Sequence, residues 1–84
     1  MSLEELRKAI KQQDLTYGTE QTLKNLKLSK VKVVFLASNC PQEVRDNVTH
    51  YAELANAKIM ELEIPDEEVG VLCKKRHSVS VLSY

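Results

Sequence analysis

The sequence predicts an α/β fold, a three-layer α/β/α sandwich with a mixed sheet of about four strands. One observation is the strand expected over residues 31–37, in which the run from Val33 to Ala37 lacks polar alternation and is typical of a central strand buried on both faces. A second is that other strand patterns alternate with helical patterns along the chain. A third is that the connecting segments are short. With 84 residues, the chain is expected to form one domain, residues 1–84.

Helical spacing of apolar residues predicts four helices. We expect them over residues 2–13 and 19–28, in a segment beginning at Pro41, and in a short segment beginning at Pro65. Thr19 is the expected N-cap of the second helix, and Pro41 suits the first position of the third. The residues expected to face the core are Leu3, Leu6 and Ile10; Leu23 and Leu26; Val44, Val48, Tyr51, Ala52 and Ala55; and Val69 and Leu72.

The strands are expected over residues 15–17, 31–37, 58–64 and 78–81. The segments 58–64 and 78–81 alternate apolar and polar residues, which predicts one exposed face for each. The first strand is short and runs directly into Gly18. Glycine can adopt backbone conformations closed to other residues and lets another backbone approach closely.

The composition limits the classes of partner. The formal net charge is zero, with 12 basic and 12 acidic residues, which counts against a general electrostatic binder of nucleic acid. The charges are nevertheless unevenly placed, because residues 1–38 hold seven Lys and Arg against four Asp and Glu. Basic residues gather at Lys24, Lys27, Lys30 and Lys32, and again over residues 74–77. A solvated surface explains each cluster alone more often than a ligand does.

Neither an enzyme nor a membrane protein is expected. No apolar run approaches the roughly 20 residues of a membrane helix, so we expect a soluble, cytoplasmic protein. Cys40 and Cys73 lack metal-ligand spacing and are expected to be buried thiols. His50 is expected to be partly buried, and a pairing of His77 with Cys73 is a weak indication of catalysis. We therefore expect no catalytic residue, cofactor, metal or small-molecule substrate.

The junction after Tyr17 is the first candidate for a site. A helix that starts after a glycine offers free backbone amides and a partial positive charge, which suit a phosphate or a polar base edge. Glu20, Gln21 and Lys24 would project from its first turns. Taken alone, these eight residues are more typical of an ordinary strand-to-helix connection than of a binding site.

Taken in order, four motifs resemble one family. They are Gly18-Thr19-x-x-Thr22-x-Lys24, the segment from Val33 to Pro41, Val69-Gly70, and His77-Ser78-Val79-Ser80. Together they are similar to the kink-turn RNA-binding ribosomal proteins, the large-subunit proteins seven-Ae and thirty-e, with the thirty-e branch closer. The resemblance covers nearly the whole chain and implies the same α/β/α sandwich.

The resemblance implies a non-catalytic protein that stabilises kink-turn RNA, a structured RNA that bends sharply at a bulge flanked by sheared G·A pairs. The glycine-led helix would enter the groove beside those pairs, and the loop before the last strand would cover the bulged nucleotide. Asn39 matches an RNA-contacting asparagine of the thirty-e branch, although a turn or cap explains it as readily. The RNA-binding residues implied are Gly18, Thr19, Glu20, Gln21, Lys24, Asn39, Lys74, Lys75, Arg76 and His77.

Two features depart from the family pattern. Glu20 stands where asparagine or lysine is usual, and an ionised glutamate can only accept hydrogen bonds. Residues 74–77 are Lys-Lys-Arg-His, where the seven-Ae branch has apolar residues. We expect an archaeal ribosomal protein or a close paralogue that acts in translation with rRNA and other ribonucleoprotein components. The alternative is a protein-interaction module on the same fold that has lost RNA binding.

Overall fold

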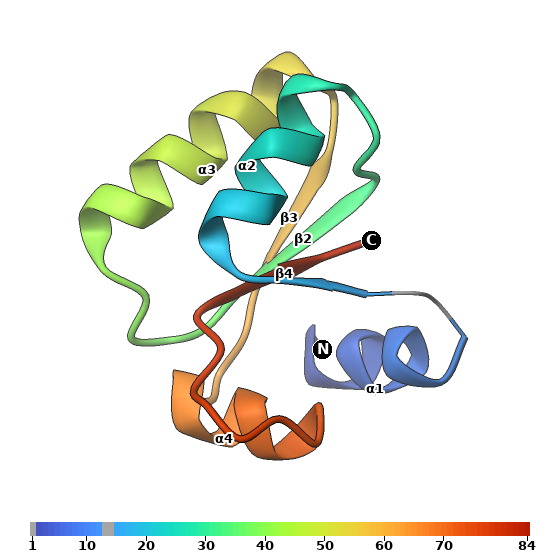
Figure 1. Cartoon of the computed structure of the whole chain (residues 1–84), viewed down its shortest axis with the longest axis vertical. Helices are drawn as coiled ribbons and strands as arrows, with labels where there is room; N and C mark the ends of the chain where they lie inside the picture. The colour runs from blue at the N-terminus through green and yellow to red at the C-terminus, as the bar shows by residue number, and fades with distance from the viewer. Residues whose placement is uncertain (1, 13–14) are drawn as a thin grey trace.

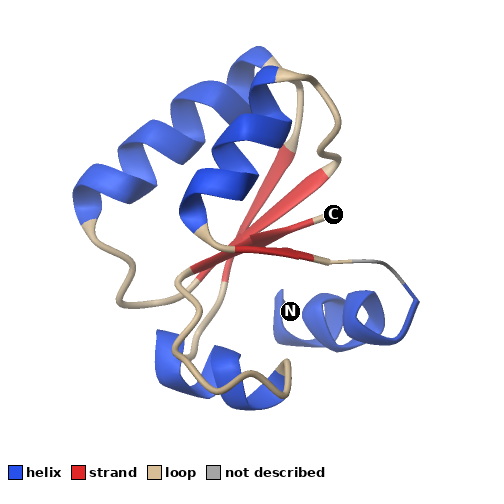
Figure 2. Ribbon diagram, in the orientation of Figure 1, coloured by secondary structure: helices blue, strands red, loops and turns tan. Residues whose placement is uncertain are grey.

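The computed structural model describes residues 2–12 and 15–84 and shows helices on both sides of a sheet (Figures 1 and 2). The expected end of the first helix at residue 13 lies outside the described residues. In chain order the elements are α1 (Ser2–Gln12), β1 (Thr16–Tyr17), α2 (Thr19–Lys27), β2 (Val33–Leu36), α3 (Gln42–Leu54), β3 (Lys58–Glu61), α4 (Asp66–Leu72) and β4 (Val81–Ser83).

The sheet is mixed, as predicted. Its strand order is β1-β4-β2-β3. β2 and β3 are parallel, whereas β4 runs antiparallel to both of its neighbours, β1 and β2. Figure 1 shows α2 and α3 covering one face of the sheet and α1 and α4 covering the other. These helices and this sheet are the three layers that the alternating patterns predict.

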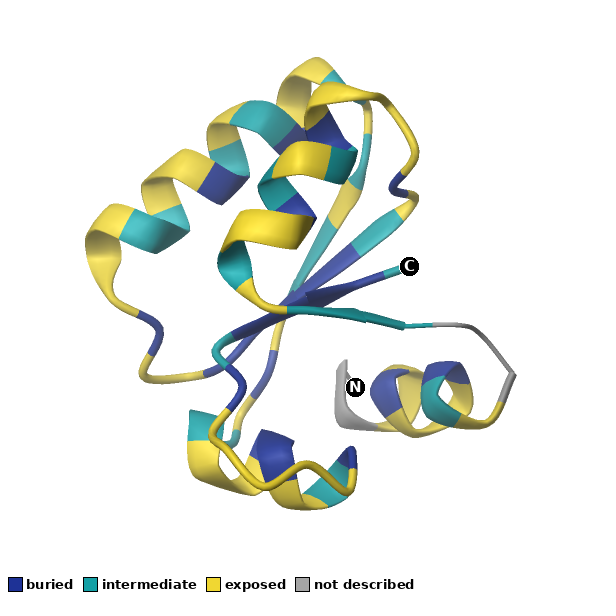
Figure 3. Cartoon of the chain, viewed as in Figure 1, coloured by how far each residue is buried: buried dark blue, intermediate teal, exposed yellow. Residues whose placement is uncertain are grey.

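The central strand β2 is buried on both faces, which confirms the prediction from its apolar run (Figure 3). Val34 and Leu36 pack with Leu26 of α2 and Val48 of α3. Phe35 points to the opposite face. There it belongs to a cluster with Leu6 and Ala9 of α1, Val69 of α4, and Cys73, which is the C-cap of α4. The period of two along a strand thus divides one apolar segment between two cores.

All four strands differ from the expected ranges. β1 and β2 are shorter, at Thr16–Tyr17 and Val33–Leu36 rather than 15–17 and 31–37, and the last two strands differ most. β3 ends at Glu61 rather than residue 64, and β2 ends at Leu36. Beyond these ends the two chains are still joined by the Leu62 amide to the Leu36 carbonyl (2.8 Å) and by the Ser38 amide to the Ile64 carbonyl (2.9 Å), but the regular strand ladder does not continue. β4 covers Val81–Ser83 rather than residues 78–81. The Val79 amide donates to the Asp66 carbonyl of α4 (3.0 Å). Residues 78–80 are therefore held against a helix and form a loop instead of a strand.

Three side chains or caps also differ from expectation. Gly18, not Thr19, is the N-cap of α2, and Pro41 is the N-cap of α3 rather than its first helical residue. Pro41 suits that position because an N-cap has an extended backbone, here φ −56° and ψ 141°. His50 is exposed rather than partly buried, and its ring packs edge-on against Tyr51 with centroids 5.2 Å apart.

Three helices end in the same way, and none of them uses glycine. Ser29, Asn56 and Lys74 follow the C-caps of α2, α3 and α4 and have φ of 55°, 57° and 57°. After α2, the Lys30 amide donates to the Asn25 carbonyl (2.9 Å) and the Ser29 amide to the Leu26 carbonyl (3.0 Å). This is the Schellman arrangement, which normally places glycine at the left-handed position.

We predict that Ser29→Gly stabilises the protein by about 0.5–1 kcal/mol. Glycine removes the strain of a left-handed serine, and this gain exceeds the added entropy of the unfolded chain. Urea denaturation measures the change in the free energy of unfolding. Asn56→Gly is the matched control and should gain less, since asparagine tolerates this conformation better than serine. A lower midpoint for Ser29→Gly would contradict the prediction.

Candidate nucleic-acid interface

The start of α2 and the segment before β4 lie side by side at the end of the sheet where β1 ends and β4 begins. β1 pairs with β4, placing Tyr17 opposite Leu82. One residue later the Gly18 amide donates to the Val81 carbonyl (2.9 Å). At the neighbouring strand the Ala37 amide donates to the Ser80 carbonyl (2.9 Å). Pairing of β4 on both sides therefore brings together the first and last of the four sequence motifs.

The backbone of Gly18 requires glycine, as expected. Its φ of 101° and ψ of 153° lie in a region essentially restricted to glycine. A Cβ placed there would meet no atom within 4 Å, so the requirement comes from the backbone and not from packing. The exposed Gly18 consequently leaves open space above the chain. No side chain among the described residues caps α2, which leaves its first-turn amides for water or a ligand.

The helix α2 is held on the sheet by a buried polar contact. Thr22 and Ser83 are both fully buried, and their hydroxyl oxygens lie 3.2 Å apart. Each hydroxyl can donate or accept, so the pair satisfies both groups without water. Asn25 adds a weaker bond from its side-chain amide to the Thr16 hydroxyl (3.4 Å). These contacts fix the first turns of α2 relative to β1 and β4.

A surface hollow of ≈ 480 Å³ lies where these segments meet. Two parts of the chain far apart in sequence line it, namely the end of β1 with the start of α2, and the loop leading into β4. The residues lining it are Tyr17, Gly18, Thr19, Lys75, His77, Ser78, Val79, Ser80 and Val81. Four of the predicted site residues thus share one surface: Gly18, Thr19, Lys75 and His77.

Lys75 is held at the hollow by an aromatic ring. Its ammonium nitrogen lies 4.2 Å from the centroid of the Tyr17 ring, a cation–π contact worth about 0.5–1 kcal/mol at an exposed site. The Tyr17 hydroxyl shares a hydrogen bond with the Cys73 thiol, and burial together with this neighbour raises the pKa of Tyr17. Tyr17 therefore remains a neutral donor at physiological pH. The ring connects the basic loop to the start of α2.

The loop from Lys74 to Ser78 is positioned by a close backbone contact with α4. A Cβ at Gly70 would overlap the His77 carbonyl oxygen and approach the Ser78 Cα. The Lys75 amide also donates to the Gly70 carbonyl (2.8 Å). Gly70 therefore lets the loop fold back directly over the helix, and this brings Lys75 and His77 to the hollow.

Asn39 acts as a cap on α4. Its side-chain amide donates to the Asp66 carboxylate (2.9 Å), and its side-chain oxygen accepts from the Asp66 backbone amide (2.9 Å). This reciprocal pair ties the loop after β2 to the first residue of α4. The cap interpretation of Asn39 thus has a structural basis. Asn39 remains exposed and does not line the hollow.

A protein-family model described as the ribosomal protein L7Ae/L30e/S12e/Gadd45 family matches residues 2–84. The chain belongs to this family. It is 35% identical over 79 residues to the large ribosomal subunit protein eL30 of Methanopyrus kandleri, covering 94% of this chain and 72% of that protein. It is 33% identical to the protein of the same name from Saccharolobus solfataricus, covering 94% of this chain and 73% of that one.

The fold of this family member also has a solved counterpart. A protein with unknown function from Bacillus halodurans superposes with a TM-score of 0.80, covering 93% of this chain and 77% of that one, at 19% identity. At this identity the likeness concerns the fold alone. It agrees with the α/β/α sandwich described above.

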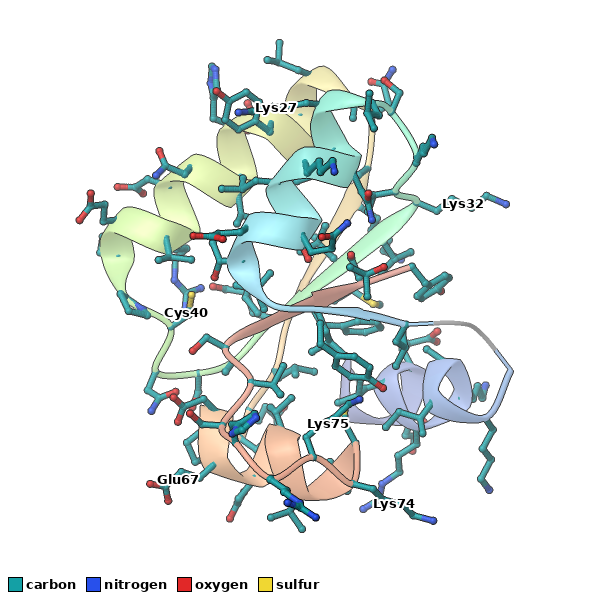
Figure 4. The ribbon with its side chains drawn as sticks, viewed as in Figure 1. Lys27, Lys32, Cys40, Glu67, Lys74 and Lys75 are labelled. Atoms are coloured by element: carbon teal, nitrogen blue, oxygen red, sulfur yellow. The ribbon has the colours of Figure 1, made fainter. Side chains whose placement is uncertain are left out.

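The remaining predicted site residues of this L7Ae/L30e family member lie around the hollow without lining it. Glu20, Gln21 and Lys24 are exposed on α2, and Lys74 and Arg76 are exposed in the loop after α4. Figure 4 shows Lys74 and Lys75 together at the same end of the molecule.

Five of the lining residues were not predicted from the sequence: Tyr17, Ser78, Val79, Ser80 and Val81. Tyr17 could have been found, because an aromatic residue directly before the glycine is well placed to contact whatever approaches Gly18. Residues 78–80 were expected to be part of a strand. Their alternating pattern gave no signal that α4 would hold them as a loop.

Both cysteines, Cys40 and Cys73, are buried, and they form no disulfide within the part of the chain that the structure describes. Burial raises the pKa of Cys73, although the Tyr17 hydrogen bond and the charge of Lys75 act to lower it. Burial raises the pKa of Cys40 as well. Both thiols are therefore protonated near pH 7 and are poor nucleophiles. Within residues 2–12 and 15–84, no helix is long and apolar enough to cross a membrane.

We predict that Gly70→Ala destabilises the protein by about 1–3 kcal/mol, because the added methyl overlaps the backbone of His77. Alanine favours a helix over glycine by about 1 kcal/mol, so the measured sign shows which effect is larger. Urea denaturation gives the stability, and amide chemical shifts of residues 74–79 report displacement of the loop.

The control is Val71→Ala on the next residue, which is 74% exposed. It should change neither the stability by more than a few tenths of a kcal/mol nor the loop shifts. An unchanged or higher midpoint for Gly70→Ala, with unchanged shifts, would show that the loop does not depend on this contact.

Proposed function

We propose that residues 1–84 act as one non-catalytic RNA-binding domain that recognises and stabilises kink-turn RNA. The observation that carries the proposal is the hollow shared by Gly18, Thr19, Lys75 and His77. Membership of a ribosomal protein family supports an RNA ligand. The proposed place of action is the cytoplasm, in the large ribosomal subunit or in another ribonucleoprotein.

In this proposal the start of α2 enters the widened groove of the RNA. Gly18 leaves room for a base or a sugar to approach the backbone. The uncapped amides of Thr19, Glu20 and Gln21 face the same side and suit an oxygen acceptor. The side chain of Gln21 can both donate and accept at base edges, and Lys24 neutralises a phosphate.

The loop after α4 forms the second wall. Lys74, Lys75 and Arg76 supply positive charge toward the phosphates, and His77 lies over the place of the bulged nucleotide. Asn39 uses one amide hydrogen and its oxygen to hold Asp66. Its second amide hydrogen and the second lone pair of its oxygen remain available. Because the same contacts fix α4, we propose that Asn39 both supports this wall and contacts RNA at its edge.

Binding of this kind stabilises the bent RNA because the protein has more contacts with the bent form than with the extended form. The protein would recognise the bent RNA by its shape and through a few basic side chains. This mode of binding does not need a large positive net charge, and the formal net charge is zero. No step of covalent chemistry is required.

The second candidate function is a protein-interaction module on the same fold. The observation that favours it is the exposed Glu20 on the first turn of α2. A carboxylate there repels phosphates and would suit a basic partner surface. RNA binding experiments separate the two candidates directly.

We predict that the protein binds a kink-turn RNA at least tenfold more tightly than a plain RNA duplex of equal length. The hollow and the first-turn amides fit a bent, widened groove, whereas a regular A-form helix presents neither bulge nor exposed sheared pairs. Gel-shift titrations measure both affinities, and a kink-turn with its G·A pairs replaced by Watson–Crick pairs is the matched RNA control. Equal affinities for all three RNAs would favour the protein-interaction module.

We further predict that Glu20→Asn or Glu20→Lys tightens kink-turn binding by roughly ten- to a hundredfold, or about 1–3 kcal/mol. The change removes repulsion from phosphates and adds a donor. Thermal stability should change little, because Glu20 is exposed. Glu43→Asn and Glu43→Lys make the same charge changes in the first turn of α3 and serve as controls.

The control variants should alter affinity far less, since only the long-range charge differs. If Glu20→Asn and Glu20→Lys weaken binding instead, Glu20 is a favourable contact to the RNA of this protein. A carboxylate can accept from a guanine or cytosine amino group, so that result has a defined chemical origin.

A further inference from the structure

A second group of basic side chains lies at the end of the sheet opposite the hollow. Lys27 is in the last turn of α2, Lys30 and Lys32 are in the loop that leads into β2, and Lys58 is the first residue of β3. All four are exposed. We refer to Lys27, Lys30, Lys32 and Lys58 as the lysine cluster.

The topology places the lysine cluster at the end of the sheet where β2 and β3 begin. β2 and β3 are parallel, so both begin at the same end of the sheet. The Lys58 amide donates to the Lys32 carbonyl (2.9 Å), which sets these two residues beside each other. The Schellman turn after α2 holds Lys30 through its bond to the Asn25 carbonyl (2.9 Å). The cluster is therefore fixed by backbone contacts from three elements.

The cluster is separate from the proposed kink-turn interface. α2 begins at the hollow and runs to Lys27, a length of nine residues or about 13 Å at roughly 1.5 Å per residue. β2 then returns from the cluster to the hollow edge. Figure 4 shows Lys27 and Lys32 at one end of the molecule and Lys74 and Lys75 at the other.

Within residues 2–12 and 15–84, no lysine of the cluster takes part in an ion pair. Among the described residues, the structure contains one ion pair, between Arg45 and Glu61, and neither residue belongs to the cluster. Between Gln21 and Gln42 the sequence has four lysines and no acidic residue. Glu53, near the end of α3, lies with Ala57 and Ile59 at a different hollow. Lys27 is oriented by the Tyr51 ring, with its nitrogen 5.1 Å from the centroid.

We propose that the lysine cluster binds the phosphate backbone of a second RNA segment, so that the protein bridges two parts of a folded RNA. Lysine ammonium groups are compact, mobile charges that neutralise phosphates without requiring a fixed geometry. Four such groups suit contact with several successive phosphates. This function goes beyond kink-turn recognition, because it needs neither a bulge nor sheared pairs and uses the opposite end of the fold.

The test uses the full chain saturated with an unlabelled, short kink-turn RNA, which occupies the hollow. A fluorescent plain RNA duplex of about 16 base pairs is then titrated, and its anisotropy is followed at several salt concentrations. We expect the loaded protein to bind the duplex. The triple variant Lys30→Gln, Lys32→Gln, Lys58→Gln should bind it at least tenfold more weakly, with a log–log salt slope shallower by about 2–3.

The matched control is Arg7→Gln, Lys8→Gln, Lys11→Gln on α1, which makes the same charge change on another surface and should leave duplex affinity within about threefold. Amide chemical shifts should move at Lys30, Lys32 and Lys58 when duplex is added. The affinity of the cluster variant for the kink-turn alone should stay within about threefold, so failure of the bridge is distinguishable from failure of kink-turn recognition.

Three results would overturn the proposal. One is that the loaded protein does not bind the duplex. Another is that the α1 variant loses as much affinity as the cluster variant, which would indicate a general charge effect. The third is that a glutamate homopolymer of equal charge competes as well as RNA, which would make the exposed Leu28 and the cluster a surface for an acidic protein.

Discussion

The antiparallel pairing of β4 between β1 and β2 is the constraint on which the rest of the interface depends. One neighbour supplies Gly18 and the start of α2, and the other supplies Ala37 and the turn that contains Asn39. Each is linked to β4 by backbone hydrogen bonds, which are insensitive to the identity of most side chains. The same strand carries Ser83, whose buried bond to Thr22 fixes the rotation of α2. A short strand of three residues thus sets the positions of the start of α2 and of the end of β2 relative to each other at the hollow.

The basic loop that follows α4, residues 74–78, is held in place by α4 itself. Gly70 admits the loop backbone, the Asp66 carbonyl accepts from Val79, and Asn39 caps the helix from the loop after β2. The helix is only seven residues long and would not persist in isolation. Its order therefore comes from these tertiary contacts and from Val69 in the core. Mutations of buried residues in α4 should consequently displace the loop that lines the hollow, although these residues do not reach the surface.

Much of the fold follows from local patterns, whereas the details of the site depend on contacts between distant residues. The two buried faces of β2 and the positive φ of Gly18 could be predicted because each depends on one short segment. The boundaries of β4 could not, since the Val79 bond to Asp66 joins two parts of the chain that share no motif. Threonine is a preferred N-cap residue, so Thr19 was the expected cap of α2, but the backbone conformation makes Gly18 the N-cap instead. His50 stands beside the apolar stripe of α3 in sequence, but the rotation of that helix leaves it in water.

The contact between Lys75 and Tyr17 means that the free protein has already ordered a long side chain at the hollow, the proposed binding surface. An unrestrained lysine loses up to about 2 kcal/mol of rotamer entropy when a ligand immobilises it, and part of that loss has occurred here before any ligand arrives. The arrangement also makes two uses of the ring mutually exclusive. A nucleobase that stacks on the face of Tyr17 occupied by Lys75 must displace the ammonium group, which is then free to move to a phosphate. Stacking and charge neutralisation at this position are therefore coupled through a single aromatic ring.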